Sequence, residues 1–382
     1  MIPLPPLRAP LAEYEARAEQ LRLAFAAGDG DALALVHKSH PHFRDPDVPW
    51  KPRELAPGEL ETATLDAAAA RLALARFLSY RDWDALAAHV TAIATPASPV
   101  CAFELAVEAL VTGDSASLEA LLAAHPDLVH ARSTRVTCFD PPVHRATLLH
   151  YVAANGVEAH RQKTPPNAVA IARCLLQAGA EVDALASLYG GEHTTMSLLV
   201  SSTHPAQAGV QLPLVALLLD HGADADGFHR ATNVRTALLF GFVEAAELLV
   251  SRGAKVDDLT LAAGLGRTEQ VAHMVVRAAP ADVQAALALA AMLGHTEAVR
   301  LLLDAGADPD RYNPSGMHAH ATPLHQAALA GHMDVVVTLV ERGARLDQCD
   351  KIWKGRPVHW ARHGGRDDVR AYLESAMPRP PS

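Results

Sequence analysis

The sequence contains few cysteines and few aromatic residues. Only four cysteines occur in 382 residues, and they are scattered along the chain at Cys101, Cys138, Cys174 and Cys349. This spacing lacks the paired arrangement of a zinc site, and a chain of this length can build a core without disulfides. We therefore expect four free thiols and no cofactor held by cysteine.

Long apolar runs and a surplus of basic residues are also absent. No stretch approaches the roughly 18 apolar residues that cross a bilayer, and the opening MIPLPPLRAP lacks the apolar segment of a signal peptide. The formal net charge is −10, and an acidic surface repels the phosphates of nucleic acids and anionic lipids. We expect a cytoplasmic protein that binds neither nucleic acid nor a membrane.

The sequence has no HExxH, GxSxG or P-loop motif. Their absence does not exclude an enzyme, because a catalytic triad is recognised by its geometry rather than by the order of its residues. A protein without catalytic activity is nevertheless the favoured interpretation, with no catalytic residue and no cofactor proposed.

One short pattern recurs along the chain. In each copy an apolar helical segment ends at Gly-Ala, and the stretch closes with an aspartate. The copies are CLLQAGAEVD (174–183), ALLLDHGADAD (216–226), ELLVSRGAKVD (247–257), RLLLDAGADPD (300–310) and TLVERGARLD (338–347). Recurrence of this kind predicts an array of stacked repeats, each too small to form a core alone.

The stretch TPLHQAALAGHMDVVVTLVERGARLD (322–347) resembles the consensus of the ankyrin-repeat family, and the resemblance extends over roughly residues 100–375. It implies an all-α fold, an α-solenoid in which each repeat has two helices and a short β-hairpin finger. The spacing of turn glycines gives about eight repeats. The intervals between Gly241, Gly266 and Gly294 are shorter than the ~33 residues of a full repeat, so we expect these two units to lack the finger.

Three regions follow from this pattern. Residues 1–99 are expected to form an atypical helical N-terminal cap, in which 18–41 repeats the helix, Gly-Asp, helix rhythm as a degenerate repeat. Residues 100–377 would form the solenoid, and residues 378–382 a disordered tail. A cap is needed because a terminal repeat must cover one open face of the array.

The stretch MHAHATPLHQAALAGH (317–332) contains four histidines. The resemblance assigns a structural role to five histidines of the chain. His150, His325 and His359 occupy the slot that hydrogen-bonds within its own repeat and to the next repeat. His295 and His332 occupy the Gly-His turn between two helices.

His318 and His320 fit neither slot. In an extended backbone both imidazoles would point to one face and could bind a metal, with Cys349 and Asp350 as candidates for further ligands. The alternative is that they are solvated or contact a partner. A metal site usually has three or four protein ligands, so we favour the alternative and predict no bound metal.

The inner helices should present a stripe of residues to the concave groove. This stripe includes, among others, Tyr151, Asn155, Leu198, Ser202, Phe240, Gln326 and Trp360. Its middle is apolar, which indicates either an exposed binding groove or burial against the N-terminal cap or within tightly curved repeats. The sequence leaves both interpretations open.

Two neighbouring repeats carry expanded loops at the same edge, residues 157–167 and 203–211. With the finger 187–194, for which a Gly190–Gly191 turn is predicted, these loops could form the walls of a pocket. The polar groups expected to converge there are Arg161, Lys163, Tyr189, Glu192, His193 and His204. The alternative is that the two loops merely pack on each other.

The last repeat, DKIWKGRPVHWARHGGR (350–366), interleaves basic residues with Trp353 and Trp360. It could stack on nucleic-acid bases, but a polar C-terminal cap is the favoured interpretation for an acidic chain. The function predicted for the whole chain is a non-enzymatic module that binds a protein partner in its groove. The rival prediction is a small-molecule or enzymatic pocket near the loops 157–167 and 203–211.

Overall fold

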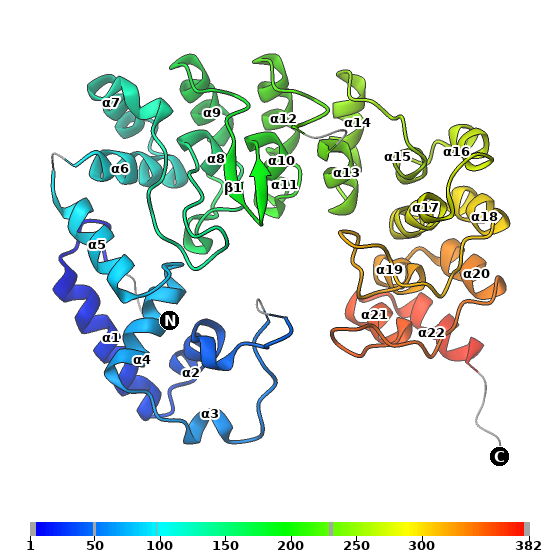
Figure 1. Ribbon diagram of the computed structural model, residues 1–382, viewed down its shortest axis with the longest axis horizontal. Coiled ribbons are helices and arrows are strands. Elements are labelled where there is room, and N and C mark those ends of the chain that lie inside the picture. Colours follow the sequence, from blue (N-terminus) through cyan, green and yellow to red (C-terminus); the bar gives the residue numbers. More distant parts are fainter. Residues whose placement is uncertain (1–4, 49–50, 97, 229–231, 378–382) are drawn as a thin grey trace. The chain divides into compact units, whose positions relative to one another are not determined.

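The computed structural model describes residues 5–48, 51–96, 98–228 and 232–377, and Figure 1 shows that helices dominate this part of the chain. The predicted all-α class is therefore confirmed. The chain divides into two compact units, Met1–Asp224 and Ala225–Ser382, and each is described by itself. The tail predicted at 378–382 lies outside the described residues.

The first unit begins with a group of helices built around one apolar core. The elements are α1 (Leu11–Ala26), α2 (Gly30–Ser39), η1 (Pro41–Phe43), α3 (Glu59–Thr62), α4 (Ala67–Phe77) and α5 (Trp83–Ala94). Helices α1 and α2 both pack on α4, and Leu21, Phe25 and Leu74 are buried between them. The predicted Gly-Asp junction is present, and the Asp29 carboxylate caps α2 by accepting a hydrogen bond from Ala32 N at 2.9 Å.

The rest of the first unit consists of helix pairs. The elements are α6 (Pro99–Thr112), α7 (Ser115–Ala124), η2 (Pro126–His130), α8 (Leu148–Val152), η3 (Ala159–Arg161), α9 (Ala168–Gln177), α10 (Thr195–Leu199), α11 (Thr203–Gln207) and α12 (Gln211–Asp220). Helix α8 packs between α6 and α10, and α9 packs on α12. Each expanded loop contains a short helical turn, η3 or α11, which the sequence analysis did not predict.

One finger of the first unit forms a β-hairpin. Strand β1 (Ala186–Leu188) pairs antiparallel with β2 (Gly191–His193), and Leu188 faces Gly191. The turn residues are therefore Tyr189 and Gly190, one position earlier than predicted, with φ angles of 52° and 76°. A type I′ turn requires a positive φ at both central residues, which fits this pair. These are the only strands assigned within the described part of the chain.

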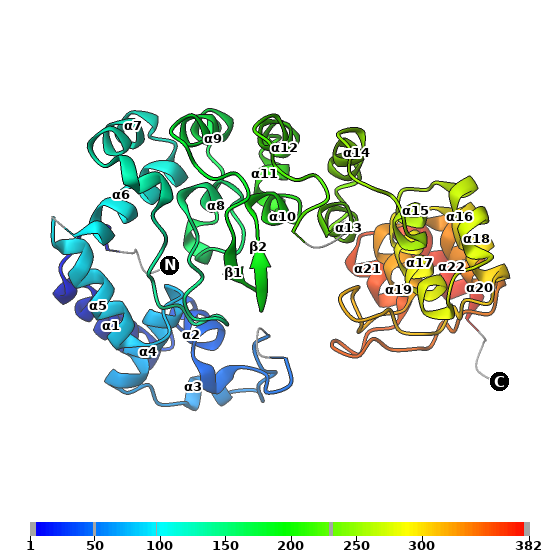
Figure 2. The ribbon, with the colours of Figure 1, turned by 45° about the horizontal axis from the view of Figure 1, so that its top comes forward.

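The second unit is built from five helix pairs in the described residues. They are α13 (Thr232–Leu239) with α14 (Val243–Ser251), α15 (Leu259–Gly264) with α16 (Thr268–Val275), α17 (Pro280–Leu293) with α18 (Thr296–Asp304), α19 (Pro323–Ala330) with α20 (Met333–Glu341), and α21 (Pro357–His363) with α22 (Asp367–Ala376). Figures 1 and 2 both show α17 and α18 side by side.

The connections between these pairs differ in length as the sequence predicted. Residues 252–258 join α14 to α15 and residues 276–279 join α16 to α17, so neither connection has room for a finger. Longer connections, 305–322 and 342–356, precede α19 and α21. The two fingerless units are therefore confirmed, whereas the total number of repeats stays a prediction.

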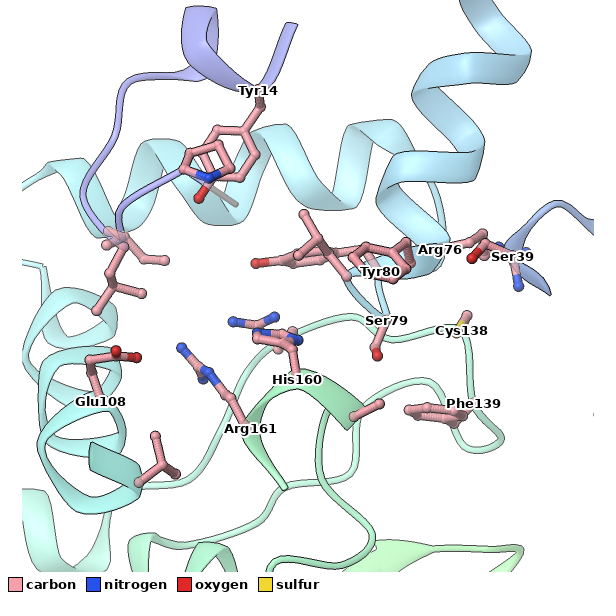
Figure 3. Close-up of a pocket in the computed structure, with 18 of the residues that line it drawn as sticks. Tyr14, Ser39, Arg76, Ser79, Tyr80, Glu108, Cys138, Phe139, His160 and Arg161 are labelled. Atoms are coloured by element: carbon pink, nitrogen blue, oxygen red, sulfur yellow. The ribbon is translucent and has the colours of Figure 1, made fainter. Parts of the chain in front are cut away.

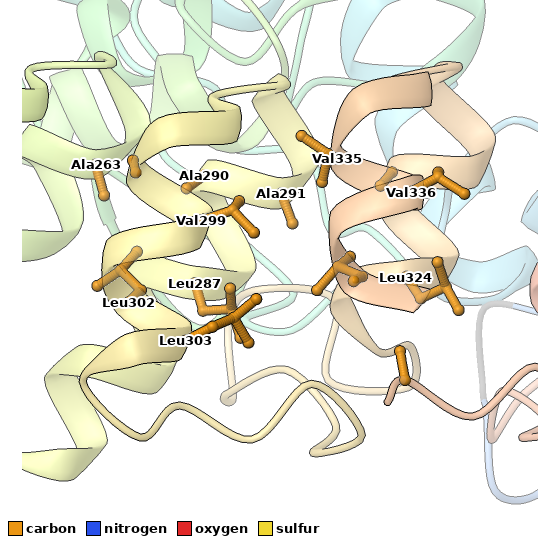
Figure 4. Close-up of a cluster of buried hydrophobic side chains, with 14 of the residues drawn as sticks. Ala263, Leu287, Ala290, Ala291, Val299, Leu302, Leu303, Leu324, Val335 and Val336 are labelled. Carbon is orange, nitrogen blue, oxygen red and sulfur yellow. The ribbon is translucent and has the colours of Figure 1, made fainter. Parts of the chain in front are cut away.

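One apolar cluster of the second unit runs through the four helix pairs from α15 to α22. Leu287, Leu302, Leu324 and Val336 are among its fully or almost fully buried side chains, and Figure 4 shows them on successive helices. Small alanines on the inner helices let neighbouring helices approach closely. No single helix in the described ranges is long and apolar enough to cross a membrane; α5 and α6 meet that test only as a bent pair, by length and composition alone.

Four of the five histidines with assigned slots contact a neighbouring repeat, and the hydrogen bond of His359 is local. His325 Nδ1 lies 2.7 Å from Thr322 Oγ1 and its Nε2 lies 3.1 Å from Gly355 O in the following repeat. His150 makes the equivalent contacts with Thr147 and His193 O, at 2.8 and 3.2 Å. Nδ1 of His359 accepts a hydrogen bond from the N–H of its own cap residue, at 3.2 Å. The predicted local and inter-repeat bonding is confirmed for His150 and His325.

The two turn histidines reach back to the preceding repeat. His295 Nε2 lies 2.9 Å from Gly264 O, and His332 Nε2 lies 3.1 Å from Met292 O. Each ring lies on a turn glycine, so that a Cβ at Gly266 would come within 2.6 Å of His295 Nδ1 and one at Gly294 within 2.7 Å of His332 Nδ1. Since real Cβ atoms do not approach so closely, these turns need glycine for space as well as for a positive φ.

Candidate functional site

The second unit carries an aromatic hollow of about 730 Å³, which we call the tryptophan surface. It lies between the inner helices α19 and α21 and the loops that precede them. The residues that line it are His318, His320, Gln326, Leu329, Trp353, Lys354, Gly355, His359, Trp360 and His363. No carboxylate is among the described residues of this lining.

Asp350 builds the loop that carries this surface. Its carboxylate is 1% exposed and accepts hydrogen bonds from Ile352 N, Trp353 N and Gly355 N at 2.9, 2.6 and 2.8 Å, and from Trp360 Nε1 at 3.1 Å. Burial alone would raise the pKa of Asp350, but these hydrogen bonds outweigh it and lower the pKa below its usual value. One ionised carboxylate thus closes the loop and positions both indoles.

The rings of the tryptophan surface contact one another. The ring centroids of Trp353 and Trp360 are 6.0 Å apart, and His320 lies 5.0 Å from Trp353 and 5.7 Å from Trp360. Burial lowers the pKa of His320 below 6.5, so its ring is neutral at pH 7. Trp353 nevertheless remains 52% exposed, which leaves a large apolar ring facing solvent.

His318 and His320 lie in turns rather than in an extended strand, and His318 has a φ of 59°. Their ring centroids are 6.1 Å apart. In the described ranges no group of three or more His, Cys, Asp or Glu side chains is placed to hold a metal ion. That the protein binds no metal stays a prediction.

The first unit contains a buried network of four charges. Glu104 comes from α6, Arg135 from the chain between η2 and α8, and Glu158 and Arg161 from the expanded loop at η3. Arg161 Nη2 lies 2.5 Å from Glu104 Oε2, Arg135 Nη2 lies 3.2 Å from the same oxygen, and Arg135 Nε lies 3.2 Å from Glu158 Oε1. All four side chains are at most 3% exposed.

Two histidines complete the ion network. His89 Nε2 lies 3.0 Å from Glu104 Oε1, and His144 Nε2 lies 3.2 Å from Glu158 Oε1. Burial would raise the pKa of both carboxyl groups, but the arginines outweigh it and hold the pKa of Glu104 and Glu158 below the usual range. The two carboxylates and two guanidinium groups are therefore all ionised, and their charges balance.

A cavity of about 710 Å³ lies next to this network, and we call it the arginine cavity. In Figure 3, Tyr14 and Tyr80 approach it from one side, and His160 and Arg161 from the other. Burial lowers the pKa of His160 to about 3, with a further contribution from Arg135 and Arg161, so this ring is neutral. The cavity belongs wholly to the first unit.

Several of the predicted groove residues lie in the interior. Tyr151, Leu198, Ser202, Arg161 and Gln326 are at most 5% exposed. Tyr151 and Leu198 are buried within the first unit, and the Tyr151 ring contacts Phe103 of α6 rather than the predicted N-terminal cap. Their part in binding stays a prediction, but neither ring nor isobutyl group lines an open groove.

The finger brings some of the predicted polar groups together. The Tyr189 hydroxyl donates to Asn155 Oδ1 at 2.9 Å, and the Tyr189 and His193 ring centroids are 5.9 Å apart. Glu192 instead accepts from Ser187 Oγ at 2.7 Å across the hairpin. Arg161 does not join this group, because it turns inward to Glu104.

Four further predicted residues lie elsewhere. Lys163 is exposed and lines the arginine cavity, and His204 is half-buried in α11. Phe240 is 56% exposed in the second unit but is not in the lining of the tryptophan surface. Trp360 does line that surface. Arg161 and Lys163 thus lie at the arginine cavity, and that Glu192, His193 and His204 take part in binding stays a prediction.

Glu104, Arg135 and Glu158 were not among the residues predicted to be functional. A signal for Glu104 was available, because it lies within the apolar helix PVCAFELAVEALVT, three positions after Cys101 and three before Val107. Residues at this spacing share a helix face, so a carboxylate there had to be buried and therefore paired. Arg135 and Glu158 lie in irregular segments without such a pattern.

Comparison with known proteins finds repeats in the second unit. The family model described as ankyrin repeats (3 copies) matches residues 259–350. The chain is 39% identical to mouse cyclin-dependent kinase 4 inhibitor B over 85 residues, which is 22% of this chain and 62% of that protein. It is 35% identical to human cyclin-dependent kinase inhibitor 2A over 124 residues, 31% of this chain and 77% of that protein.

A third relative is much longer than the matched region. The chain is 38% identical to the mouse inactive serine/threonine-protein kinase TEX14 over 92 residues, which is 24% of this chain and 6% of that protein. The chain thus spans somewhat less than two thirds of the mouse kinase inhibitor and a small part of TEX14. This chain and its relatives are similar in their repeats, and this similarity supports a module for protein–protein interaction.

Proposed function

Because this chain belongs to the ankyrin-repeat proteins, we propose that it is a non-enzymatic module that recognises a protein partner through the tryptophan surface. Stacked repeats offer an extended face formed by their inner helices and loops, and proteins of this kind commonly bind partners there. The single observation that carries the proposal is the exposed indole of Trp353 on a loop fixed by Asp350.

The energetics of protein interfaces support this choice. A few aromatic and arginine side chains usually provide most of the binding free energy, and they lie in preformed pockets. Trp353 and Trp360 are such side chains, and the four hydrogen bonds to Asp350 fix their loop before a partner arrives. A preformed surface binds more tightly because less conformational entropy is lost on association.

The lining also indicates the chemistry of the partner. It combines two indoles with Lys354 and four histidines, and the described lining has no carboxylate. An apolar or aromatic side chain flanked by acidic residues complements this surface. We therefore propose that the partner presents a segment of that composition.

The test compares two apolar side chains of equal exposure. Trp353 is 52% exposed in the second unit and Leu23 is 54% exposed in the first. We expect Trp353→Ala to remove the proteins captured by the immobilised wild-type chain, and Leu23→Ala to retain them. Both variants should keep the wild-type melting temperature. Capture of the same proteins by wild-type and Trp353→Ala chains would contradict the proposal.

Protein kinases are the first partner class to assay, because two of the relatives are named as inhibitors of cyclin-dependent kinases. The assay is binding of purified cyclin-dependent kinase 4 to the wild-type chain and to the two variants. A kinase that bound the Trp353→Ala chain as tightly as the wild type would place the interface elsewhere.

A further inference from the structure

We propose that the arginine cavity of the first unit binds a small organic anion, held by the cationic side chains along its wall and by the aromatic rings beside them. This site is separate from the tryptophan surface, and it does not depend on the protein partner proposed above. The cavity has the size of a ligand site, a cationic wall, buried nitrogens without hydrogen-bond partners and several aromatic rings.

The cavity has the dimensions of a ligand site. Its volume of about 710 Å³ falls within the roughly 300–1,000 Å³ typical of pockets for small molecules. Its walls come from several segments of the first unit, including Tyr14 on α1, Tyr80 after α4 and the turn η3. Walls that come from separate elements of one compact unit hold a defined shape.

The lining is cationic although the chain as a whole is acidic. The charges of Arg135 and Arg161 are balanced by Glu104 and Glu158, as described above. Beyond them the lining includes the cations Lys38, Arg76 and Lys163. Glu108 is the only carboxylate among the described residues of the lining. In a chain of net charge −10, this local excess of positive charge favours an anion.

Some buried nitrogens at the cavity wall have no hydrogen-bond partner in the described part of the chain. They are Arg76 Nε and His160 Nδ1, and Arg161 Nη1, also buried, lies 3.9 Å from Glu158 Oε2, which is beyond hydrogen-bond distance. Buried polar groups are normally hydrogen-bonded, so a set of such nitrogens around one cavity requires an explanation. The oxygens of a carboxylate, sulfonate or phosphate group are the acceptors that guanidinium groups bind best.

Aromatic rings define the rest of the ligand. Tyr14 and Tyr80 lie at the inner wall, and Phe139, which is 46% exposed, lies at the outer wall. The Tyr80 ring already stacks with the Arg135 guanidinium, 4.5 Å from its centroid. The ligand class that fits is therefore an anionic group attached to a planar, largely apolar body.

The probe for this class is 8-anilinonaphthalene-1-sulfonate, an aromatic sulfonate whose fluorescence rises in apolar sites. We expect saturable binding to the full chain that weakens as salt is added, because screening reduces attraction between charges. The matched neutral probe is N-phenyl-1-naphthylamine, which lacks the sulfonate. It should bind at least about tenfold more weakly if the cationic wall contributes.

Paired variants locate the binding. Lys38 and Lys163 are exposed, so Lys38→Gln with Lys163→Gln should fold normally and weaken sulfonate binding about tenfold. The control removes two charges of the same unit that do not line the cavity, Arg17→Gln with Arg173→Gln, and should leave binding unchanged. Ala159→Trp should also block binding, because it places an indole at an exposed position of the lining.

Three results would overturn the proposal. The first is that the sulfonate does not bind, and the second is that both paired variants weaken it equally. The third is that Trp353→Ala removes the binding while the cavity variants leave it intact, because the probe would then occupy the tryptophan surface. That third result would leave the protein-partner proposal untouched.

Discussion

The two units differ in the charged groups that they bury. In the described part of the second unit the buried carboxylate is that of Asp350, which accepts hydrogen bonds from N–H donors, and an apolar cluster of leucines, valines and alanines passes from one helix pair to the next between α15 and α22 (Figure 4). The first unit instead buries two arginines and two glutamates where α6 meets the expanded loop. Helix pairs of the same kind can therefore be joined by apolar contact or by paired charges.

This difference in buried charge should affect how the stability of each unit responds to amino-acid substitution. The stability that an apolar core provides varies with the buried area, and such a core tolerates many substitutions of similar volume. A buried ion pair adds little net stability, because desolvation of the charges offsets their attraction. Removal of one partner is strongly destabilising, because it leaves the other charge buried without compensation. We therefore expect the first unit to be more sensitive to single changes of charge.

The largest effect is expected from Glu104→Gln. The amide keeps the shape of the side chain but leaves Arg135 and Arg161 with one carboxylate between them in the interior. The expected loss is about 3–5 kcal/mol of unfolding free energy. Hydrogen exchange measured by mass spectrometry would detect it as faster exchange in peptides from residues 99–161.

The matched control is a pair on the surface. Glu297 and Arg300 form an ion pair with side chains 64% and 50% exposed, and such pairs contribute little in water. Glu297→Gln should change stability by less than about 0.5 kcal/mol. Equal effects of the two substitutions would remove the distinction between the units.

Acidification should also weaken the first unit. Burial lowers the pKa of His150 to about 4 and that of His160 to about 3, against 6.5 for an ordinary histidine. The unfolded chain therefore takes up protons first, so stability is full above pH 6.5 and falls as the pH drops toward 4. At pH 5 the loss is about 2 kcal/mol for each histidine.

Urea unfolding at pH 7 and pH 5, followed by circular dichroism, measures this loss. Glu104 and Glu158 remain ionised over that range because their pKa values are lowered, so their contribution is lost only at lower pH. In His160→Gln the difference between the two pH values should shrink. An unchanged difference would show that His160 is not the group that titrates.

Among the substitutions of buried residues, the smallest effect is expected in the apolar core of the second unit. Leu302 is fully buried, and Leu302→Met conserves its volume and its apolar character. The cost should be below about 1.5 kcal/mol. Hydrogen exchange of peptides from residues 280–345 provides the measurement. A loss as large as that of Glu104→Gln would show that the second core is as specific as the ion network.

Local patterns in the sequence were sufficient for the helix pairs. The Pro residues that begin α19 and α21, the turn glycines and the histidines of the slots all occupy recurring positions within one repeat. The short connections around α15 and α16 also followed from spacing alone. Recurrence marks these positions in the sequence, although the histidines and glycines also contact a neighbouring repeat.

The candidate sites depended on contacts that such patterns do not record. Arg161 was expected at the rim of a groove because its loop is polar and expanded, but it turns inward to Glu104 on α6. Nothing near Arg161 in the sequence specifies that partner. Similarly, Asp350 fixes Trp353 and Trp360 because four N–H groups donate hydrogen bonds to its carboxylate. The sequence pattern does not specify that these four groups meet at one side chain.

The adjacent pair Gly294 and His295 has a consequence for how such a chain can lengthen. Gly294 receives the ring of His332 from the repeat that follows, and His295 covers Gly266 in the repeat that precedes. One repeat therefore carries both halves of a contact that recurs along the unit. A gene duplication that copied this whole repeat would also copy a glycine and a histidine that fit their new neighbours. Growth by whole repeats thus preserves the junction, whereas a breakpoint between the two residues would separate the halves.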